Sequence, residues 1–280
     1  MVTNVEFFYS GYCTHPERII IDGGKLKSVK CPAVFALIRH SQLGNVLFDT
    51  GYSERFYDET DKFPLSIYAK LTPVYLEPGE SARKVLADHG IAASEINYII
   101  ISHFHADHIC GLKDFPSAKY IYNHHAYQLL GRQKGLKFLL SGYLAGLIPE
   151  DFAARSMELS ADSIVDISKE LAPFAEGYDI FGDGSIVLVD LPGHAPGQWG
   201  ALVTTGNGKQ YLLVGDAVWL SKSYQQLKLP SLLANAIMDN HKQYVATIIK
   251  LKELHQQNPA IKIIPSHCSE ALKDVSKWII

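Results

Sequence analysis

Short apolar runs bounded by turn residues recur in both halves of the chain and predict β-strands. In the first half these runs cover residues 5–9, 33–39, 46–51, 97–102 and 119–122. In the second half they cover residues 185–191, 201–205, 211–214 and 262–264. The polar stretch 41–45 separates two of the runs and favours a hairpin, so we expect adjacent antiparallel strands near the start of the chain.

Periodic apolar positions predict helices between and after these strands, over residues 81–90, 125–130 and 239–258. Ser81 and Asp239 are candidate N-caps, because a short polar side chain can accept a hydrogen bond from the first turn of a helix. The stretch 127–160 is apolar and helical in patches, which indicates an inserted helical lid rather than a separate domain. We therefore expect one α+β domain over residues 1–280, with two sheets packed face to face and helices outside.

Composition limits the class of protein without naming a chemistry. The chain has 280 residues, of which 47% are hydrophobic and 20% charged, as in an ordinary soluble enzyme. A net charge of −3 gives no reason to expect nucleic acid or a membrane as a partner. The N-terminal stretch lacks the pattern of a secretory signal, and the four cysteines show no CxxC spacing. We therefore expect a cytoplasmic protein with reduced thiols.

Six residues directly after the run 97–102 hold four candidate metal ligands, which are His103, His105, Asp107 and His108. Residues two apart in an extended loop point the same way, so His103 and His105 can bind one ion. Asp107 and His108 can then reach a second ion beside the first. Imidazole nitrogens and carboxylate oxygens are donors that a borderline ion such as Zn²⁺ accepts.

Three more candidates each follow an apolar run in the second half of the chain: His194, Asp216 and His267. Taken singly, each has a structural explanation as a turn residue or a core histidine. Taken together with the first cluster, they complete two donor sets, one of His103, His105 and His194 and one of Asp107, His108 and His267. Asp216 is the natural carboxylate to bridge the two sets. Two ions about 3.5–4 Å apart can hold a hydroxide between them.

This pattern, HxHxDH followed by separate His, Asp and His residues, resembles the metallo-β-lactamase superfamily. The resemblance runs from the LFDTG segment at residues 47–51 to Ser266-His267. It implies a four-layer αββα sandwich and a site for two divalent metal ions, usually zinc. It also implies that Asp49 orients a ligand histidine from outside the donor sets. His105 stands where the diiron flavoprotein members carry Glu, which argues against oxygen reduction.

Within this superfamily the chain is most similar to the N-acyl-homoserine lactonase group. Shared features are Gly11-Tyr-Cys13, Cys31-Pro32, the Pro-Gly-His-Ala-Pro-Gly segment around His194 and the Ser-His-Cys ending. The similarity implies hydrolysis of an ester-type carbonyl in a small molecule, foremost a lactone such as an N-acyl-homoserine lactone, by a metal-bridging hydroxide. Asp107 would act as the catalytic residue that passes a proton to the leaving group.

One position departs from that group. In those lactonases a tyrosine lies three residues beyond the bridging aspartate and contacts the substrate carbonyl, whereas this chain carries Trp219. We expect Trp219 to bind substrate, although an indole donates one hydrogen bond and cannot act as a phenol acid. Tyr9, Tyr12 and Tyr224 are candidates to supply the missing hydroxyl.

Other functions stay open. A thioester hydrolase of glyoxalase-II type shares the ligand pattern but would need a basic helical region after His267, where this sequence has a short segment. A secreted β-lactamase would need an export signal, and a nuclease a basic surface. A metal-stabilised binding protein without catalysis is the alternative from another class. The apolar stretch 135–149, with residues 232–233 and 237–238, could roof the site and hold an acyl chain, or form ordinary core or a homodimer contact.

Overall fold

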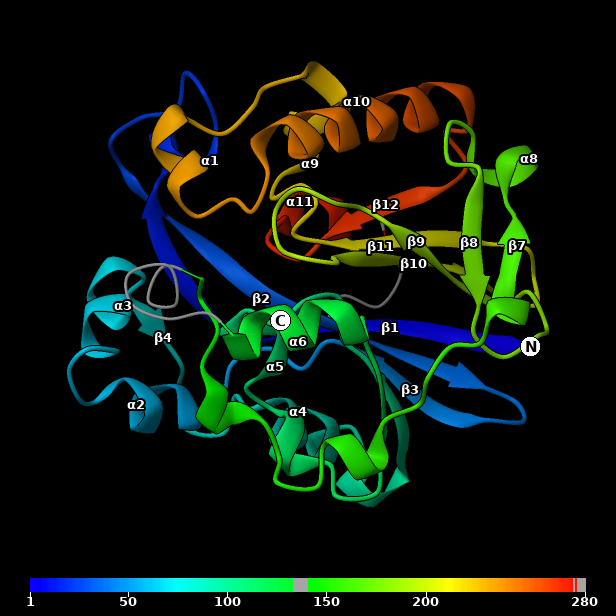
Figure 1. Ribbon diagram of the computed structural model, residues 1–280, viewed down its shortest axis with the longest axis horizontal. Coiled ribbons are helices and arrows are strands. Elements are labelled where there is room, and N and C mark those ends of the chain that lie inside the picture. The colour runs from blue at the N-terminus through cyan, green and yellow to red at the C-terminus, as the bar shows by residue number, and fades with distance from the viewer. Residues whose placement is uncertain (133–140, 274, 276–280) are drawn as a thin grey trace.

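Two mixed six-stranded sheets form the centre of the computed structural model, which describes residues 1–132, 141–273 and 275 (Figure 1). The first sheet has the order β4-β1-β2-β3-β5-β6. Its strands are β1 (Val2–Pro16), β2 (Ser28–His40), β3 (Gly44–Phe48), β4 (Val74–Tyr75), β5 (Ile96–Ile100) and β6 (Lys119–Ile121). The second sheet has the order β12-β11-β10-β9-β8-β7. Its strands are β7 (Ile164–Asp166), β8 (Glu176–Asp179), β9 (Ile186–Asp190), β10 (Trp199–Thr204), β11 (Gln210–Gly215) and β12 (Lys262–Pro265).

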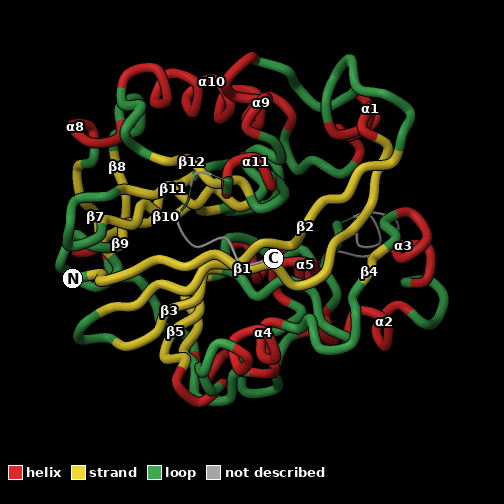
Figure 2. The backbone as a smooth tube through the Cα atoms, turned by 180° about the vertical axis from the view of Figure 1, so that it is seen from behind, coloured by secondary structure: helices red, strands yellow, loops and turns green. Residues whose placement is uncertain are grey.

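Helices cover the outer face of each sheet (Figures 1 and 2). The helices on the side of the first sheet are α2 (Arg55–Thr60), α3 (Ser66–Leu71), α4 (Ala82–Asp88), α5 (Ala106–Ile109) and α6 (His124–Arg132). The remaining helices are α1 (Glu17–Ile20), α8 (Ser168–Leu171), α9 (Ser221–Gln226), α10 (His241–Gln257) and α11 (Ser269–Leu272). Among the described residues, no helix combines the length and the apolar character needed to cross a membrane.

Three apolar clusters explain the layering. Phe7 and Ile38 from the first sheet pack with Leu188 and Leu213 from the second, which fills the space between the sheets. A second cluster lies between the first sheet and α4 to α6, and a third joins the second sheet to α10 through residues such as Ile248. Burying apolar side chains on both faces of a sheet removes them from water at about 25 cal/mol per Å². The αββα order expected from the sequence is confirmed.

The strands β1 and β2 are much longer than the apolar runs predict, and the strands are more numerous. β1 continues to Pro16 because it pairs with β2 on both sides of an irregularity between Tyr9 and Tyr12, where Gly11 has a φ of 67°. A positive φ suits glycine, since it has no Cβ to clash with the backbone. Strands β4, β7 and β8 were not predicted because they are short and largely lack buried apolar residues.

One helix cap was predicted at the wrong residue. Asn240, not Asp239, is the N-cap of α10, and its side chain accepts a hydrogen bond from the Gln243 backbone N–H at 3.1 Å. The backbone N–H of Asp239 instead donates to the carbonyl of His194 at 3.0 Å. The start of α10 therefore holds the loop that carries a predicted metal ligand. Ser81 does occupy the N-cap position of α4, but its side chain makes no capping hydrogen bond.

The lid predicted over residues 127–160 overlaps α6 at its start, and residues 133–140 lie outside the described part. Its later portion contains the short 3-10 helices Ala145–Leu147 and Ala153–Arg155. The Gly142 carbonyl accepts a hydrogen bond from the Ala106 N–H at 3.0 Å, directly beside the histidine cluster. The lid and the single domain over residues 1–280 both stay predictions.

Candidate metal centre

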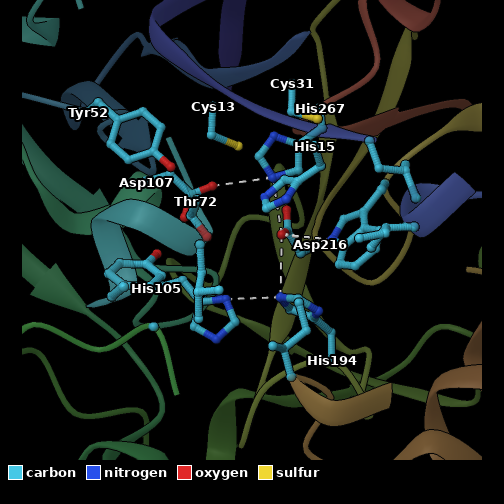
Figure 3. Close-up of a pocket in the computed structure, with 17 residues that line it drawn as sticks. Cys13, His15, Cys31, Tyr52, Thr72, His105, Asp107, His194, Asp216 and His267 are labelled. Atoms are coloured by element: carbon cyan, nitrogen blue, oxygen red, sulfur yellow. Dashed lines mark hydrogen bonds and ion pairs between the residues drawn. The ribbon is translucent and has the colours of Figure 1, made fainter. Parts of the chain in front are cut away.

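Seven predicted ligands converge from the ends of strands in both sheets. His103, His105, Asp107 and His108 lie on the loop after β5 and on the first turns of α5. His194 follows β9, Asp216 follows β11 and His267 follows β12, so the second sheet delivers the other three. Figure 3 shows His105, Asp107, His194, Asp216 and His267 facing one another across a cavity. The structure thus brings all seven side chains to one place.

The first donor set contains His103, His105, His194 and Asp216, whose ligand atoms all lie within 4.8 Å of one another. The Nε2 atom of His194 lies 3.0 Å from Nδ1 of His105 and 3.3 Å from Oδ2 of Asp216. Burial lowers the pKa of His194 to about 3, so this imidazole is neutral at pH 7. A neutral imidazole offers a nitrogen lone pair to a cation.

The second donor set contains Asp107, His108, Asp216 and His267, again within 4.8 Å. His267 Nε2 lies 3.2 Å from Oδ2 of both Asp107 and Asp216, and His108 Nε2 lies 3.3 Å from Oδ1 of Asp216. Burial alone would raise the pKa of Asp216, but His267 and His108 hold it well below its usual range. Asp216 belongs to both sets, with Oδ2 close to His194 and His267 and Oδ1 close to His108.

Hydrogen bonds outside the donor sets orient three of the imidazoles. His108 Nδ1 donates to Asp49 Oδ2 at 2.7 Å, and His267 Nδ1 donates to the Pro32 carbonyl at 2.8 Å. Asp49 also accepts hydrogen bonds from the backbone N–H and from the hydroxyl of Ser102. Because the Ser102 hydroxyl donates its proton to Asp49, its oxygen accepts from His103 Nδ1 at 3.0 Å. With Nδ1 as the donor in each case, Nε2 faces the cavity and is the nitrogen that can bind a cation.

The atoms that face the centre fit metal ions. Among the described residues, the Nε2 atoms of His103 and His108 and Oδ1 of Asp216 are buried without a hydrogen-bond partner. An unsatisfied buried polar group costs about 1–3 kcal/mol, and a bound cation would satisfy all three atoms. Imidazoles and carboxylates without thiolates suit divalent ions such as Zn²⁺. The donor set therefore suits two divalent metal ions.

Asp49 is fully buried and lies against His108, and its role in orienting that ligand stays a prediction. Changing Asp49 to Asn removes the negative charge that favours the Nδ1–H tautomer of His108. We expect metal affinity at the second donor set to fall about 10- to 100-fold, as titration with a fluorescent chelator would measure. Asp190→Asn is the matched control, since Asp190 accepts from an indole outside the cavity. Unchanged metal affinity in Asp49→Asn would show that this carboxylate does not orient His108.

Trp219 lines the cavity, but its hydrogen-bond donor is already used. Its indole Nε1–H donates to Asp216 Oδ2 at 3.0 Å, and its ring meets His194 edge-on at 5.7 Å. Trp219 can therefore offer a substrate its ring but not its N–H. The expected contact between Trp219 and a substrate stays a prediction, and only the face or edge of the indole ring could make it.

Replacing Trp219 by Phe keeps an aromatic ring, although a smaller one, and removes the hydrogen bond to Asp216. A hydrogen bond to a charged group contributes about 1.5–3 kcal/mol, so we expect kcat/KM to fall about tenfold or more. Trp199→Phe is the matched control, because Trp199 donates in the same way to Asp190, at 2.8 Å and outside the cavity. Equal losses in both variants would assign the effect to stability rather than to Asp216.

The three tyrosines proposed to supply a hydroxyl are absent from the cavity lining among the described residues. Tyr12 stacks on Tyr75, and Tyr224 packs against His255. The described lining contains Tyr52 and Tyr68 instead. Figure 3 shows the Tyr52 ring with its hydroxyl directed toward Asp107. The signal for Tyr52 was its place directly after the LFDTG segment.

Apolar side chains form much of the rest of the cavity wall. Those from α1 and α3 and the loop before α10 are Ile19, Ile20, Leu71 and Ile237. Gly142 and Ile237 come from the segments predicted to roof the site and do line the cavity, while the roof and its acyl-chain role stay predictions. Leu232 and Leu233 are 83% and 75% exposed and do not belong to the described lining.

Comparison with known proteins supports the family that the metal-ligand motif indicates. The sequence pattern of the metallo-beta-lactamase superfamily matches residues 30–257. The chain belongs to the metallo-beta-lactamase superfamily. Within this superfamily it is similar to the N-acyl homoserine lactonase AttM of Azorhizobium caulinodans, with 27% identity over 263 residues that cover 93% of this chain and 90% of the relative. The AttM of Agrobacterium fabrum is 24% identical over 268 residues, with coverage of 93% and 90%.

Two solved structures show the same fold. An N-acyl homoserine lactone hydrolase with the product N-hexanoyl-L-homoserine at its catalytic metal center matches with a TM-score of 0.72 at 18% identity, covering 99% of this chain and 98% of its own. AidC, a dizinc quorum-quenching lactonase, matches with a TM-score of 0.63 at 16% identity, covering 96% and 90%.

Proposed function

We propose that this protein is a dinuclear zinc hydrolase that opens the ring of a lactone, foremost an N-acyl-homoserine lactone. One observation carries the proposal, namely that two donor sets sharing Asp216 lie in a cavity whose other walls are largely apolar. A polar reacting centre next to an apolar wall suits a lactone ring with an acyl chain. The similarity to proteins named N-acyl homoserine lactonase supports this choice of substrate.

The two ions, when bound, lower the pKa of a bound water toward about 7 and polarise a carbonyl oxygen. Asp107 lies on the cavity wall with Oδ2 3.2 Å from His267 Nε2. In our proposal its carboxylate accepts the proton of the attacking water and returns it to the ring oxygen that leaves as an alcohol. Asp49, Ser102 and Pro32 orient the imidazoles of His108, His103 and His267, and Trp219 fixes the orientation of Asp216.

Tyr52 is the candidate hydroxyl for the substrate. It is 1% exposed as a residue, and burial raises the pKa of its phenol well above the usual range, so it remains a hydrogen-bond donor at any pH of assay. In our proposal this hydroxyl donates to an oxygen of the lactone, which Trp219 cannot do.

Replacing Tyr52 by Phe should therefore lower kcat/KM about 10- to 100-fold while metal content stays unchanged. Tyr120→Phe is the matched control, since Tyr120 is also fully buried and donates to the Leu112 carbonyl outside the cavity. Steady-state kinetics on both variants shows whether the Tyr52 hydroxyl contributes to turnover. A Tyr52→Phe enzyme with the kinetics of the parent would remove Tyr52 from the mechanism.

The experiment that tests the function is a substrate panel with zinc-reconstituted protein. It compares N-acyl-homoserine lactones of short and long chains with a glutathione thioester, a β-lactam and a phosphodiester. We expect the lactones to be hydrolysed fastest, with kcat/KM rising as the acyl chain lengthens against the apolar wall. Faster thioester hydrolysis would favour the glyoxalase-II alternative, and no turnover on any substrate would favour a binding protein. The cytoplasmic location and the homodimer stay predictions.

A further inference from the structure

Two cysteines face each other on the cavity wall, on the side of the first sheet. Cys13 of β1 and Cys31 of β2 are directly opposed in the antiparallel register. Both are buried, at 5% and 6% exposed, and both line the cavity together with His15. Figure 3 shows the three side chains around His267. The hydrolytic mechanism uses none of them.

The strand geometry fixes how far apart the two cysteines lie. The Thr14 N–H donates to Pro73 on the β4 side, so the main chain of Cys13 faces β2. Cys13 and Cys31 therefore form a hydrogen-bonded antiparallel pair, for which the Cα atoms lie about 5.5 Å apart. Disulfides most often join Cα atoms about 5.5–6 Å apart, so this Cα separation lies in the range that a disulfide can span.

We propose that Cys13 and Cys31 are a redox modification site, at which hydrogen peroxide entering the cavity forms a reversible disulfide that slows hydrolysis. His15 lies two residues from Cys13 on the same face of β1 and can accept the thiol proton. The Cys13 sulfur attacks one peroxide oxygen, which gives a sulfenic acid and releases the other oxygen as water. The Cys31 sulfur then displaces the hydroxyl as a second water. In sum, two thiols lose two electrons and two protons to one peroxide.

The reaction should be slow. The adjacent Cys31 thiol and burial raise the pKa of Cys13 well above the usual range, and His15 opposes this only in part. Since the thiolate is the nucleophile, we expect oxidation over minutes to hours rather than the fast response of a dedicated peroxide sensor.

Closing the bond would reach the metal centre through the backbone. Opposed Cβ atoms in a hydrogen-bonded pair lie about 5.5 Å apart, whereas a disulfide needs about 3.8 Å. The strands must therefore draw together, and the irregularity between Tyr9 and Tyr12 gives β1 room to adjust. Cys31 precedes Pro32, whose carbonyl accepts the His267 Nδ1–H at 2.8 Å. Moving that carbonyl should lower kcat/KM about tenfold, because the loss of a hydrogen-bond partner that orients a metal-binding histidine has an effect of this size.

The test treats the zinc-loaded wild-type protein with hydrogen peroxide and first counts free thiols after denaturation. We expect the count to fall from four to two per chain, with a Cys13–Cys31 linked peptide in the mass spectrum. Cys110→Ser should still form the link, because Cys110 lies outside the described cavity lining, whereas Cys31→Ser should not. Four remaining thiols, or a link between other cysteines, would overturn the proposal without reference to any activity.

The second readout rests on the proposed function. Lactone hydrolysis should fall about tenfold on oxidation and recover with dithiothreitol, and each variant is compared with its own untreated activity. A linked peptide with unchanged hydrolysis would overturn the coupling to His267. A linked peptide in a protein that hydrolyses no lactone even when reduced would reject the proposed function and leave the disulfide site standing.

Discussion

Changing Asp216 to Ala should abolish most metal binding and lower kcat/KM for a lactone by about a thousandfold. Asp216 is the one described residue common to both donor sets, and its two oxygens face His108, His194 and His267. Its removal takes a ligand from each ion and also leaves the Trp219 N–H without its acceptor. Loss of metal-based charge stabilisation is worth several kcal/mol, and about 4 kcal/mol corresponds to a thousandfold in rate.

Metal analysis and steady-state kinetics on the same preparation measure both effects. Asp190→Ala is the control, since it removes a carboxylate that also accepts from an indole but lies outside the cavity. Wild-type metal content in Asp216→Ala would mean that the two donor sets do not share this ligand.

Changing Asp107 to Asn should lower the rate of lactone hydrolysis far more than it lowers the content of bound metal. The amide keeps an oxygen near the second donor set but cannot accept a proton at pH 7. Loss of a general acid–base group typically costs about 10²- to 10⁴-fold, so kcat should fall by that order while most metal is retained. Burial alone would raise the pKa of Asp107, yet His108 and His267 hold it well below the usual range, which keeps the wild-type carboxylate ionised.

The comparison with Asp49→Asn separates proton transfer from metal binding. Asp49 touches His108 from outside the donor sets, so its change should lower metal affinity and leave kcat nearly intact at saturating metal. A kcat in Asp107→Asn equal to that of the parent, at saturating metal, would remove Asp107 from proton transfer.

The sequence predicted the candidate centre more completely than the fold around it. His103 to His108 are adjacent in sequence, and His194, Asp216 and His267 each follow a buried strand. Strand ends meet at one edge of a packed sheet, so local pattern was sufficient to group them. The same reasoning predicted the central strands, because their apolar runs are buried on both faces.

Contacts set by tertiary packing could not be predicted in this way. Tyr52 enters the cavity from the loop after β3, where Asp49 and Gly51 both adopt positive φ angles and the Tyr52 N–H donates to the Ser10 carbonyl at 3.0 Å. The opposition of Cys13 and Cys31 depends on the β1–β2 register, which a one-residue shift would change. The choice of Asn240 over Asp239 as a cap depends on the loop that α10 holds in place.

Metal content measured together with turnover tests the central claim most directly. Elemental analysis of active protein should find two divalent ions per chain, and removing them with a chelator should abolish lactone hydrolysis until ions are restored. Full turnover by protein that contains no bound ion would contradict the account.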